Sequence, residues 1–153
     1  MRNKVDEIDV KLLQALTENS KVTCNELAKK LGISRQQVAR RLKRLEKMGI
    51  IKKYTIAVDF EKLNYIYAGL GITLKPGVPV EEIIEILKKD KDVKVIERGI
   101  GTHDIFLRVA VPKNLRELES KIHEIIMKIG EVEKVDKTII TEVVKYECIC
   151  IKP

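Results

Sequence analysis

Apolar residues in the first fifty positions recur at the three- and four-residue spacing of amphipathic helices. Asp6 can cap a first helix that runs to about Glu18. Thr23 precedes a second helix, which runs to Leu31, because Glu26 follows three residues later and completes a capping box. The pattern therefore predicts two short helices with inward-facing apolar sides.

A third helix, over residues 34–49, has one apolar and one cationic face. Ser34 and Gln37 form its capping box, and Gly49 can end it in a left-handed conformation. At about 100° per residue, three side chains form a core stripe and the basic ones fall opposite. The core stripe is Val38, Leu42 and Leu45, and the opposite face is Gln36, Arg40, Lys43 and Lys47, with Arg44 beside it. Two helices joined by a short turn at Gly32, the second of them basic, are typical of a helix-turn-helix.

The cationic face predicts that the third helix binds in a DNA major groove. Arginine offers a bidentate fork to guanine, and glutamine offers a matching pair of groups to adenine. A solvated basic helix is the alternative. The charge distribution favours DNA, because residues 1–58 hold 14 basic and 6 acidic residues, whereas residues 59–153 hold 16 and 17.

The stretch after the third helix, IIKKYTIAVD, predicts a small β wing. Positions 50, 51 and 54–58 favour strands, and the two lysines between them favour a turn. Such lysines can contact phosphates, although a solvated turn is equally consistent with the sequence. The residues predicted to bind DNA are Ser34, Arg35, Gln36, Gln37, Arg40, Arg41, Lys43, Arg44, Lys47, Lys52 and Lys53.

From Tyr67 onward the hydrophobic period changes to that of strands alternating with helices. The predicted elements are strands over 67–74, 93–100 and 104–111, helices over 79–90 and from Asn114, and a β-rich tail over 137–151. This βαββαβ order predicts a ferredoxin-like α+β domain. We therefore expect a winged helix-turn-helix domain over 1–58, a linker over 59–66 and a ferredoxin-like domain over 67–153.

One face of this predicted sheet has no helix to cover it. It carries Gly69, Gly71, Thr73, Phe106 and Ala110, which are too apolar for a solvated sheet. We infer that two such sheets pack face to face in a homodimer. A dimer presents two basic helices, so its duplex DNA sites should be pseudo-palindromic.

The sequence argues against an enzyme. His103 and His123 are its two histidines, and no catalytic triad, metal-ligand cluster or phosphate-binding glycine loop accompanies them. We expect no catalytic residue, metal or cofactor. Cys24, Cys148 and Cys150 are interpreted as packing thiols. No apolar run of about 18 residues and no signal-peptide pattern occurs, so we expect a cytoplasmic protein away from membranes.

Two other binding functions are compatible with these patterns. The βαββαβ order is also that of an RNA-recognition module, but Tyr67 and Phe106 are the aromatic residues available to stack bases. An effector-independent architectural protein that wraps DNA would carry the same basic half. Binding to single-stranded RNA would favour the first alternative, and sequence-blind DNA binding the second.

Three stretches resemble the leucine-responsive regulatory protein/AsnC (Lrp/AsnC) family of transcription regulators. They are DEIDVKLLQAL, ELAKKLGISRQQVARRLKRLEKMGIIKKYT and GIGTHDIFLRV. The resemblance implies a promoter-binding dimer that assembles further, often to an octamer. It also implies that the second domain is of the type named for regulation of amino-acid metabolism, with an amino acid held between dimers.

The resemblance points to individual residues as well. Arg41 stands where the family has a recurrent arginine, either as an ion-pair residue or as a phosphate contact. Gly101, Thr102 and Asp104 match the family's effector loop, with His103 between them. The amides of this loop can bind an amino acid's carboxylate and Asp104 its ammonium, although Gly101 and Asp104 also suit a purely structural turn. Thr138 and Thr141 are predicted to line the same effector pocket from the last strand.

Overall fold

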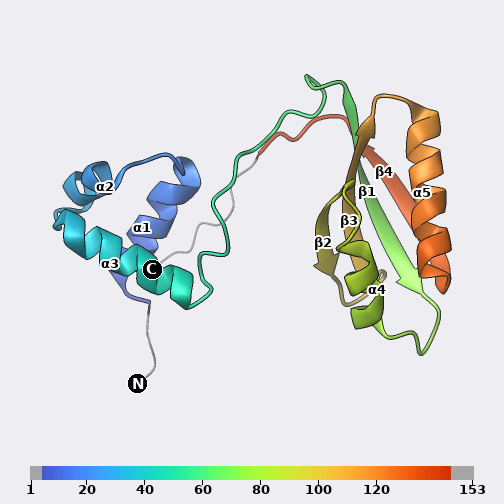
Figure 1. The fold of residues 1–153 in the computed structure, drawn as a ribbon, viewed down its shortest axis with the longest axis horizontal. Coiled ribbons are helices and arrows are strands. Elements are labelled where there is room, and N and C mark those ends of the chain that lie inside the picture. Colours follow the sequence, from blue (N-terminus) through green and yellow to red (C-terminus); the bar gives the residue numbers. More distant parts are fainter. Residues whose placement is uncertain (1–4, 146–153) are drawn as a thin grey trace. The chain divides into compact units, whose positions relative to one another are not determined.

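The computed structural model describes residues 5–145 and divides the chain into two compact units (Figure 1). The second unit spans Val58–Val143, so one boundary falls between Ala57 and Val58. The first unit contains α1 (Glu7–Glu18), α2 (Cys24–Leu31) and α3 (Arg35–Lys47). The second contains all the strands and the two remaining helices.

Local capping fixes where the three helices of the first unit begin. The Thr23 and Ser34 capping boxes are present as predicted, with Glu26 and Gln37 as their reciprocal partners. Asp6 caps α1 and forms a third such box with Asp9. The turn glycines at positions 32 and 49 have φ values of 65° and 70°, which side chains with a Cβ rarely adopt. Each of the three helices therefore begins at a capping box formed by two residues three positions apart.

The three helices enclose a small apolar core. Leu12, Leu27 and Val38 come from successive helices and are fully buried together. Cys24 is half-buried against this core as a free thiol, which agrees with a packing role. Cys148 and Cys150 lie outside the described residues.

The two strands predicted for the wing do not form among the described residues. Residues 50–58 contain turns and extended backbone, and none is assigned to a strand. Tyr54 donates a hydrogen bond of 2.8 Å to Glu46, and Ser20 donates one of 3.4 Å to the Thr55 carbonyl. Partial burial and the Glu46 contact raise the pKa of Tyr54 to about 12. The stretch has β-forming residues, but a strand also needs a neighbouring strand to bond to, and no described strand pairs with it.

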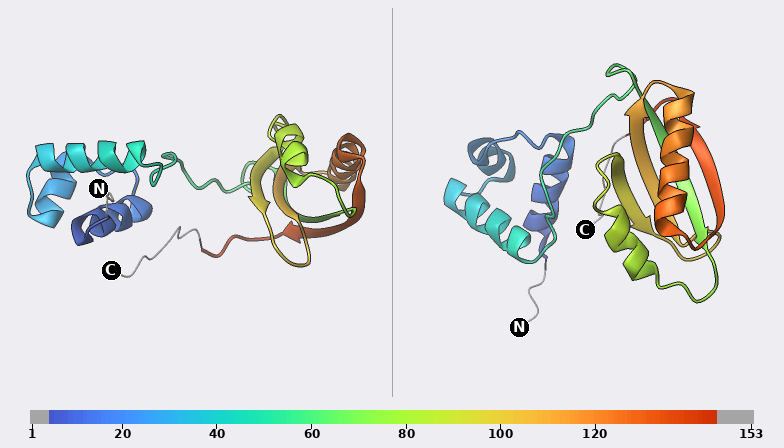
Figure 2. Two further views of the ribbon diagram at one scale, coloured as in Figure 1. Left: turned by 90° about the horizontal axis from the view of Figure 1, so that it is seen from below. Right: turned by 45° about the vertical axis from the view of Figure 1, so that its right-hand side comes forward.

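The second unit is an antiparallel sheet covered by helices on one face, as predicted (Figure 2). The elements are β1 (Tyr65–Leu74), α4 (Val80–Leu87), β2 (Val93–Arg98), β3 (Ile105–Pro112), α5 (Leu115–Ile129) and β4 (Val132–Ile140). The strand order is β2-β3-β1-β4, so β3 and β1 form the central pair and β2 and β4 are the edge strands. This confirms the ferredoxin-like βαββαβ topology.

Several element ends differ from the predictions. β1 begins at Tyr65, inside the predicted linker, because Tyr65 and Ile66 already pair with β3. Pro79 is the N-cap of α4 rather than its first residue. β4 begins five residues before the predicted start at 137 and ends at Ile140. It is an edge strand with many exposed charged side chains, so it lacks the alternation that marks a half-buried strand.

The core of the second unit lies between the sheet and its helices. The inward faces of β1 and β3 supply most of it, which confirms the predicted alternation. Its buried members are Ala68, Leu70, Ile72, Leu74, Ile83, Leu87, Ile105, Leu107, Val109, Val111, Leu118, Ile125 and Ile129.

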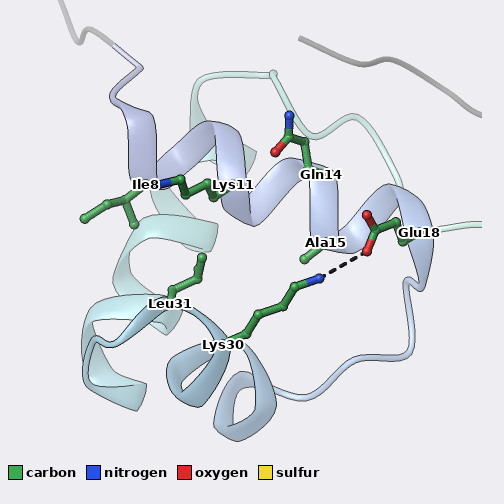
Figure 3. Close-up of a pocket in the computed structure, with 7 residues that line it drawn as sticks. All are labelled: Ile8, Lys11, Gln14, Ala15, Glu18, Lys30 and Leu31. Atoms are coloured by element: carbon green, nitrogen blue, oxygen red, sulfur yellow. Dashed lines mark hydrogen bonds and ion pairs between the residues drawn. The ribbon is translucent and has the colours of Figure 1, made fainter. Parts of the chain in front are cut away.

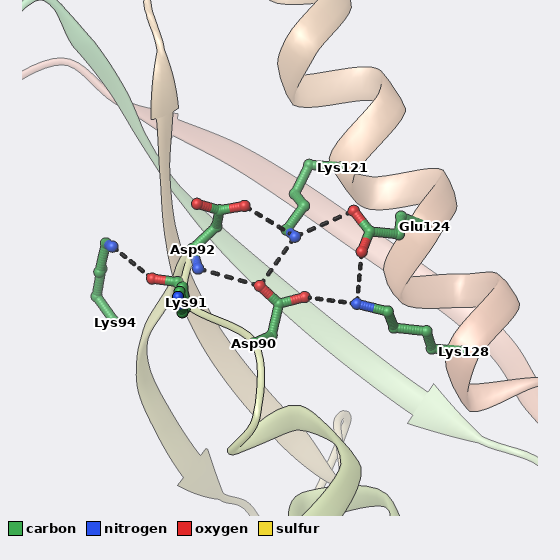
Figure 4. Close-up of polar contacts among 7 residues, drawn as sticks. All are labelled: Asp90, Lys91, Asp92, Lys94, Lys121, Glu124 and Lys128. Carbon is green, nitrogen blue, oxygen red and sulfur yellow. Dashed lines mark hydrogen bonds and ion pairs between the residues drawn. The ribbon is translucent and has the colours of Figure 1, made fainter.

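A charged cluster ties the loop after α4 to α5 (Figure 4). The ammonium of Lys121, whose side chain is 9% exposed, lies 2.8 Å from Asp90, 2.8 Å from Asp92 and 3.1 Å from Glu124. Asp90 is 4% exposed and also contacts Lys128 at 3.1 Å. Burial opposes ionisation of Asp90, but hydrogen bonds from Lys121, the Asp92 amide and Lys128 outweigh it and lower the pKa of Asp90 to about 2.

Candidate DNA interface and effector loop

One face of α3 presents cationic and amide side chains that are exposed and unengaged. Within residues 5–145, these side chains make no ion pair or hydrogen bond. They are Arg35, Gln36, Arg40, Lys43 and Lys47. Because the interior stripe of α3 is buried, this face is held outward and its donors are available to an external partner.

Ser34 and Gln37, also predicted to bind DNA, serve the start of α3. The Gln37 amide donates to the Ser34 hydroxyl at 3.1 Å, and the Ser34 amide donates to the Gln37 side chain at 2.8 Å. Both side chains satisfy backbone groups that would otherwise lack partners. Their hydrogen bonds position the helix whose exposed face follows them.

Arg41 and Arg44 contact acids of α1 rather than pointing freely outward. Arg41 lies 2.6 Å from Asp6 and 2.8 Å from Asp9, and Arg44 contacts the other oxygen of Asp9. Asp9 is fully buried. The Arg41 guanidinium lowers the pKa of Asp6, and hydrogen bonds to Asp6 and Asp9 raise the pKa of Arg41. Of the two roles considered for Arg41, an ion pair or a phosphate contact, the structure shows the ion pair. Arg44 forms an ion pair with the same Asp9.

Lys52 and Lys53 follow α3 in the extended stretch. Both are exposed, and neither has an ion-pair partner among the described residues. Their charges are therefore available to an external partner. They lie in extended backbone rather than in the strands that the sequence predicted.

A hollow of about 400 Å³ lies between α1 and α2 (Figure 3). Lys30 of α2 reaches Glu18 of α1 at 3.1 Å across it. Its lining residues are Ile8, Lys11, Gln14, Ala15, Glu18, Lys30 and Leu31. None of the residues predicted to bind DNA is among them, so the hollow and the basic face of α3 share no residue.

The predicted effector residues 101–104 lie in a loop over residues 99–104 that is fastened to the end of β1. The Gly99 amide donates to the Asp104 carbonyl, and the Asp104 amide donates to the Ile72 carbonyl, both at 2.9 Å. Gly101 has a φ of 135°, a conformation that favours glycine. The Thr73 hydroxyl donates to the Thr102 carbonyl at 2.9 Å. The loop therefore has a defined shape with its middle residues exposed.

The carboxylate of Asp104 has a structural task. One of its oxygens, Oδ2, accepts the Leu74 amide at 2.8 Å. The pairing of β1 with β4 shifts between Thr73 and Leu74, so this amide is at an irregularity of the sheet. A purely structural turn would use Asp104 for the amides of its own loop, whereas the carboxylate accepts a hydrogen bond from β1. No hydrogen bond to the other oxygen occurs within the described chain.

The His103 ring lies directly over Gly71. A Cβ added to Gly71 would be 2.5 Å from the ring. Its Nδ1 is 3.1 Å from the Thr73 hydroxyl, its Nε2 is 3.4 Å from Asp136, and it meets Phe106 edge to face at 5.1 Å. The glycines on this face predict the close approach of another backbone or sheet. At Gly71 the close neighbour is a histidine of the same chain.

The remaining effector residues are not all brought together. Thr138 is exposed on β4 opposite Gly69, two positions along β1 from the glycine under His103. Thr141 directly follows Ile140, which is the last residue of β4 and pairs with Tyr67. The register therefore places Thr138 nearer the loop than Thr141. The amides of Gly101, Thr102 and His103 have no acceptor in the described part of the chain.

Sequence reasoning missed three partners of these sites. Asp9, Thr73 and Asp136 are each at least 30 residues from the side chain that they contact. Asp9 alone has a local signal, since it is three residues after the Asp6 cap and completes a capping box. The others are set by strand register, which single-chain patterns do not give.

Within residues 5–145, no group of three or more histidine, cysteine or acidic side chains is arranged to hold a metal ion. Nor does any helix in that range have the length and apolar content needed to span a membrane.

A capped helix-turn-helix with a free cationic face on its second helix is the arrangement of DNA-binding helix-turn-helix proteins. Residues 5–52 match the family model described as winged helix-turn-helix DNA-binding. The chain is 38% identical over 146 residues to the HTH-type transcriptional regulator PH0061 of Pyrococcus horikoshii, covering 95% of this chain and 99% of that protein. The crystal structure of PH0061 superposes with a TM-score of 0.87, covering 97% of this chain and all of that one, at 40% identity.

Two further solved structures identify the family. The AsnC family transcriptional regulator of Agrobacterium tumefaciens is 26% identical, with a TM-score of 0.78, over 95% of this chain and 96% of that one. The feast or famine regulatory protein Rv3291c of M. tuberculosis, complexed with L-methionine, is 26% identical with a TM-score of 0.85, over 97% of this chain and all of that one. This chain belongs to the Lrp/AsnC family of transcriptional regulators. The prediction that it is not an enzyme is confirmed, since these relatives are regulators.

Proposed function

We propose that this regulator reads pseudo-palindromic duplex DNA as a homodimer and that an amino acid changes its binding. The observation that carries the proposal is the free outer face of α3. Gln36 and Arg40 are exposed there without partners among the described residues, whereas Arg41 and Arg44 hold the helix against α1. A helix that is fixed from one side and free on the other is suited to base readout.

Base and phosphate contacts are divided between different residues in this proposal. Gln36 and Arg40 have side chains that can form paired hydrogen bonds to adenine and guanine. Arg35, Lys43, Lys47, Lys52 and Lys53 supply charge to phosphates, which adds affinity without sequence information. Sequence preference should therefore depend on few side chains and salt dependence on many.

The dimer is proposed from the uncovered face of the sheet. Phe106 is exposed there, and the face carries glycines rather than charged residues along β1, whereas Ala110 is already buried within the single chain and adds nothing to this surface. Packing two such faces would remove this apolar surface from water. Further assembly of dimers, to an octamer as family resemblance implies, is part of the same proposal.

The effector is proposed to bind at the loop of residues 99–104. The amides of Gly101, Thr102 and His103, which have no acceptor in the described part of the chain, can donate hydrogen bonds to a carboxylate, as backbone nests do. Asp104 uses one oxygen for Leu74 and has the other available to an ammonium group. Thr138 lies on β4, which pairs with β1. Rv3291c, with the same fold, has been crystallised with L-methionine, which supports an amino acid as the ligand class.

Asp104→Asn tests the effector site while retaining its structural hydrogen bond. The amide oxygen of asparagine can still accept the Leu74 N–H, but the variant lacks the charge that would bind an ammonium. We expect calorimetric titration with each amino acid to detect one ligand for the wild type and at least about 10-fold weaker binding for Asp104→Asn. Unchanged affinity in a folded variant would place the effector elsewhere. Glu117→Gln is the matched control, since it makes the same acid-to-amide change at an exposed residue of α5.

A further inference from the structure

The outer face of the sheet carries two acids and two bases. The strand register places Glu97 on β2, Arg108 on β3, and Lys134 and Asp136 on β4 on this one face. Lys134 and Asp136 form an ion pair of 2.8 Å within the chain. Glu97 and Arg108 are exposed, and neither has an ion-pair partner in the described residues. The face thus has one satisfied and one unsatisfied pair of opposite charges.

Burying this face would be costly if the second pair stayed unsatisfied. Arg108 stands on β3 directly opposite Gly69 of the central strand β1, so a partner that covers the glycines also covers its guanidinium. An unpaired charge removed from water is strongly unfavourable, and a compensating carboxylate must come from somewhere. The summed formal charge of the four residues is zero, so the face complements a copy of itself.

Two-fold symmetry gives this complementarity a specific form. In an isologous interface, a contact from residue i to residue j is repeated from j to i. We propose that Arg108 of one copy pairs with Glu97 of a second copy, and Glu97 of the first with Arg108 of the second. This rests on the proposed sheet-to-sheet dimer and names the charged contact that fixes its register. Each dimer would contain the pair twice.

A pair within one chain is the competing arrangement. Glu97 pairs in register with Phe106, so Arg108 lies diagonally across the two strands from Glu97. A long arginine side chain can span such a diagonal. The test must therefore separate pairing within a chain from pairing between chains.

Charge reversal in separate chains makes that distinction. Arg108→Glu alone and Glu97→Arg alone each place like charges together, whichever arrangement holds. Mixing the two variants restores opposite charges only between chains, because within each chain the like charges remain. The assay is sedimentation velocity of the full-length chain over a concentration series, with each variant alone, the equimolar mixture and the wild type.

We expect each variant alone to have a dimer dissociation constant at least about 100-fold above that of the wild type, and the mixture to recover most of this loss. Arg116→Glu, an exposed arginine on α5, is the control and should dimerise normally. If the mixture dimerises no better than the single variants, or the single variants dimerise like the wild type, the cross-chain pair is wrong although the dimer stands. A monomeric wild type would instead overturn the proposed dimer and this pair with it.

Discussion

Replacing Asp90 with asparagine should lower the unfolding free energy of the second unit, because Asp90 pairs with Lys121 and Lys128 of α5. Asparagine keeps the shape of the side chain and an acceptor for the Asp92 amide, but it has no charge for Lys121 and Lys128. The pKa of Asp90 falls from 3.8 to about 2 in the folded chain. That difference corresponds to about 2 kcal/mol of unfolding free energy at pH 7, for a side chain that is almost fully buried.

The loss should depend on pH with a definite sign. Because folding lowers the pKa of Asp90, its carboxylate stabilises the folded chain fully above the unfolded pKa of 3.8. As pH falls from about 4 to about 2, that contribution disappears. Asp90→Asn should therefore be less stable than the wild type at pH 7 and differ less from it at pH 2.

Urea unfolding at fixed protein concentration, followed by circular dichroism, measures this difference. Hydrogen exchange of the α5 amides assigns the transition to the second unit. Glu85→Gln is the control, because the Glu85–Lys88 pair is largely exposed and should contribute less than about 0.5 kcal/mol. If Asp90→Asn were as stable as the wild type at pH 7, or lost as much stability at pH 2 as at pH 7, the carboxylate charge would not be what stabilises this cluster.

Three further predictions concern the first unit. Arg40→Ala should cost about 1–3 kcal/mol of binding to the preferred DNA site and relax its sequence preference, measured by fluorescence anisotropy on a set of site variants. Equal weakening on every sequence would make Arg40 a phosphate contact. Lys53→Ala should weaken all sequences alike and reduce the slope of log affinity against log salt by about 1; an unchanged slope removes it from the interface. Asp9→Asn should lower the stability of the helix-turn-helix by about 3 kcal/mol, because Arg41 and Arg44 lose a buried carboxylate, and an unaltered thermal unfolding of the helices would contradict that role.

Features encoded by neighbouring residues were predictable from the sequence. The Thr23 and Ser34 capping boxes depend on residues three apart, and both formed as expected. The alternation of β1 and β3 gave the sheet core, because each strand is buried on its helix-facing side. Periodicity also contained an unused signal: Lys121 lies three residues after Leu118 and four before Ile125, in the buried stripe of α5.

Features that join distant parts of the chain were not predictable in this way. The β-forming residues around Tyr54 predicted a strand, but a strand needs a partner that local sequence cannot supply. Arg44 falls near the basic face by helical angle, yet Asp9, 35 residues away, draws it toward α1. Likewise, the hydrogen bond from Leu74 to Asp104 follows from the folding of β1 beside the loop. Angular position on a helix limits what a side chain can contact, and tertiary packing then selects among the choices.

Selection from a random pool of duplex DNA, with and without a mixture of amino acids, tests the central claim most directly. The account predicts recovery of a motif with two half-sites, whose affinity one amino acid changes. A motif without any ligand effect would retain the DNA reader and contradict the effector loop. Recovery of no motif would contradict the central claim that Gln36 and Arg40 of α3 read bases, and would leave a protein that binds DNA without regard to sequence.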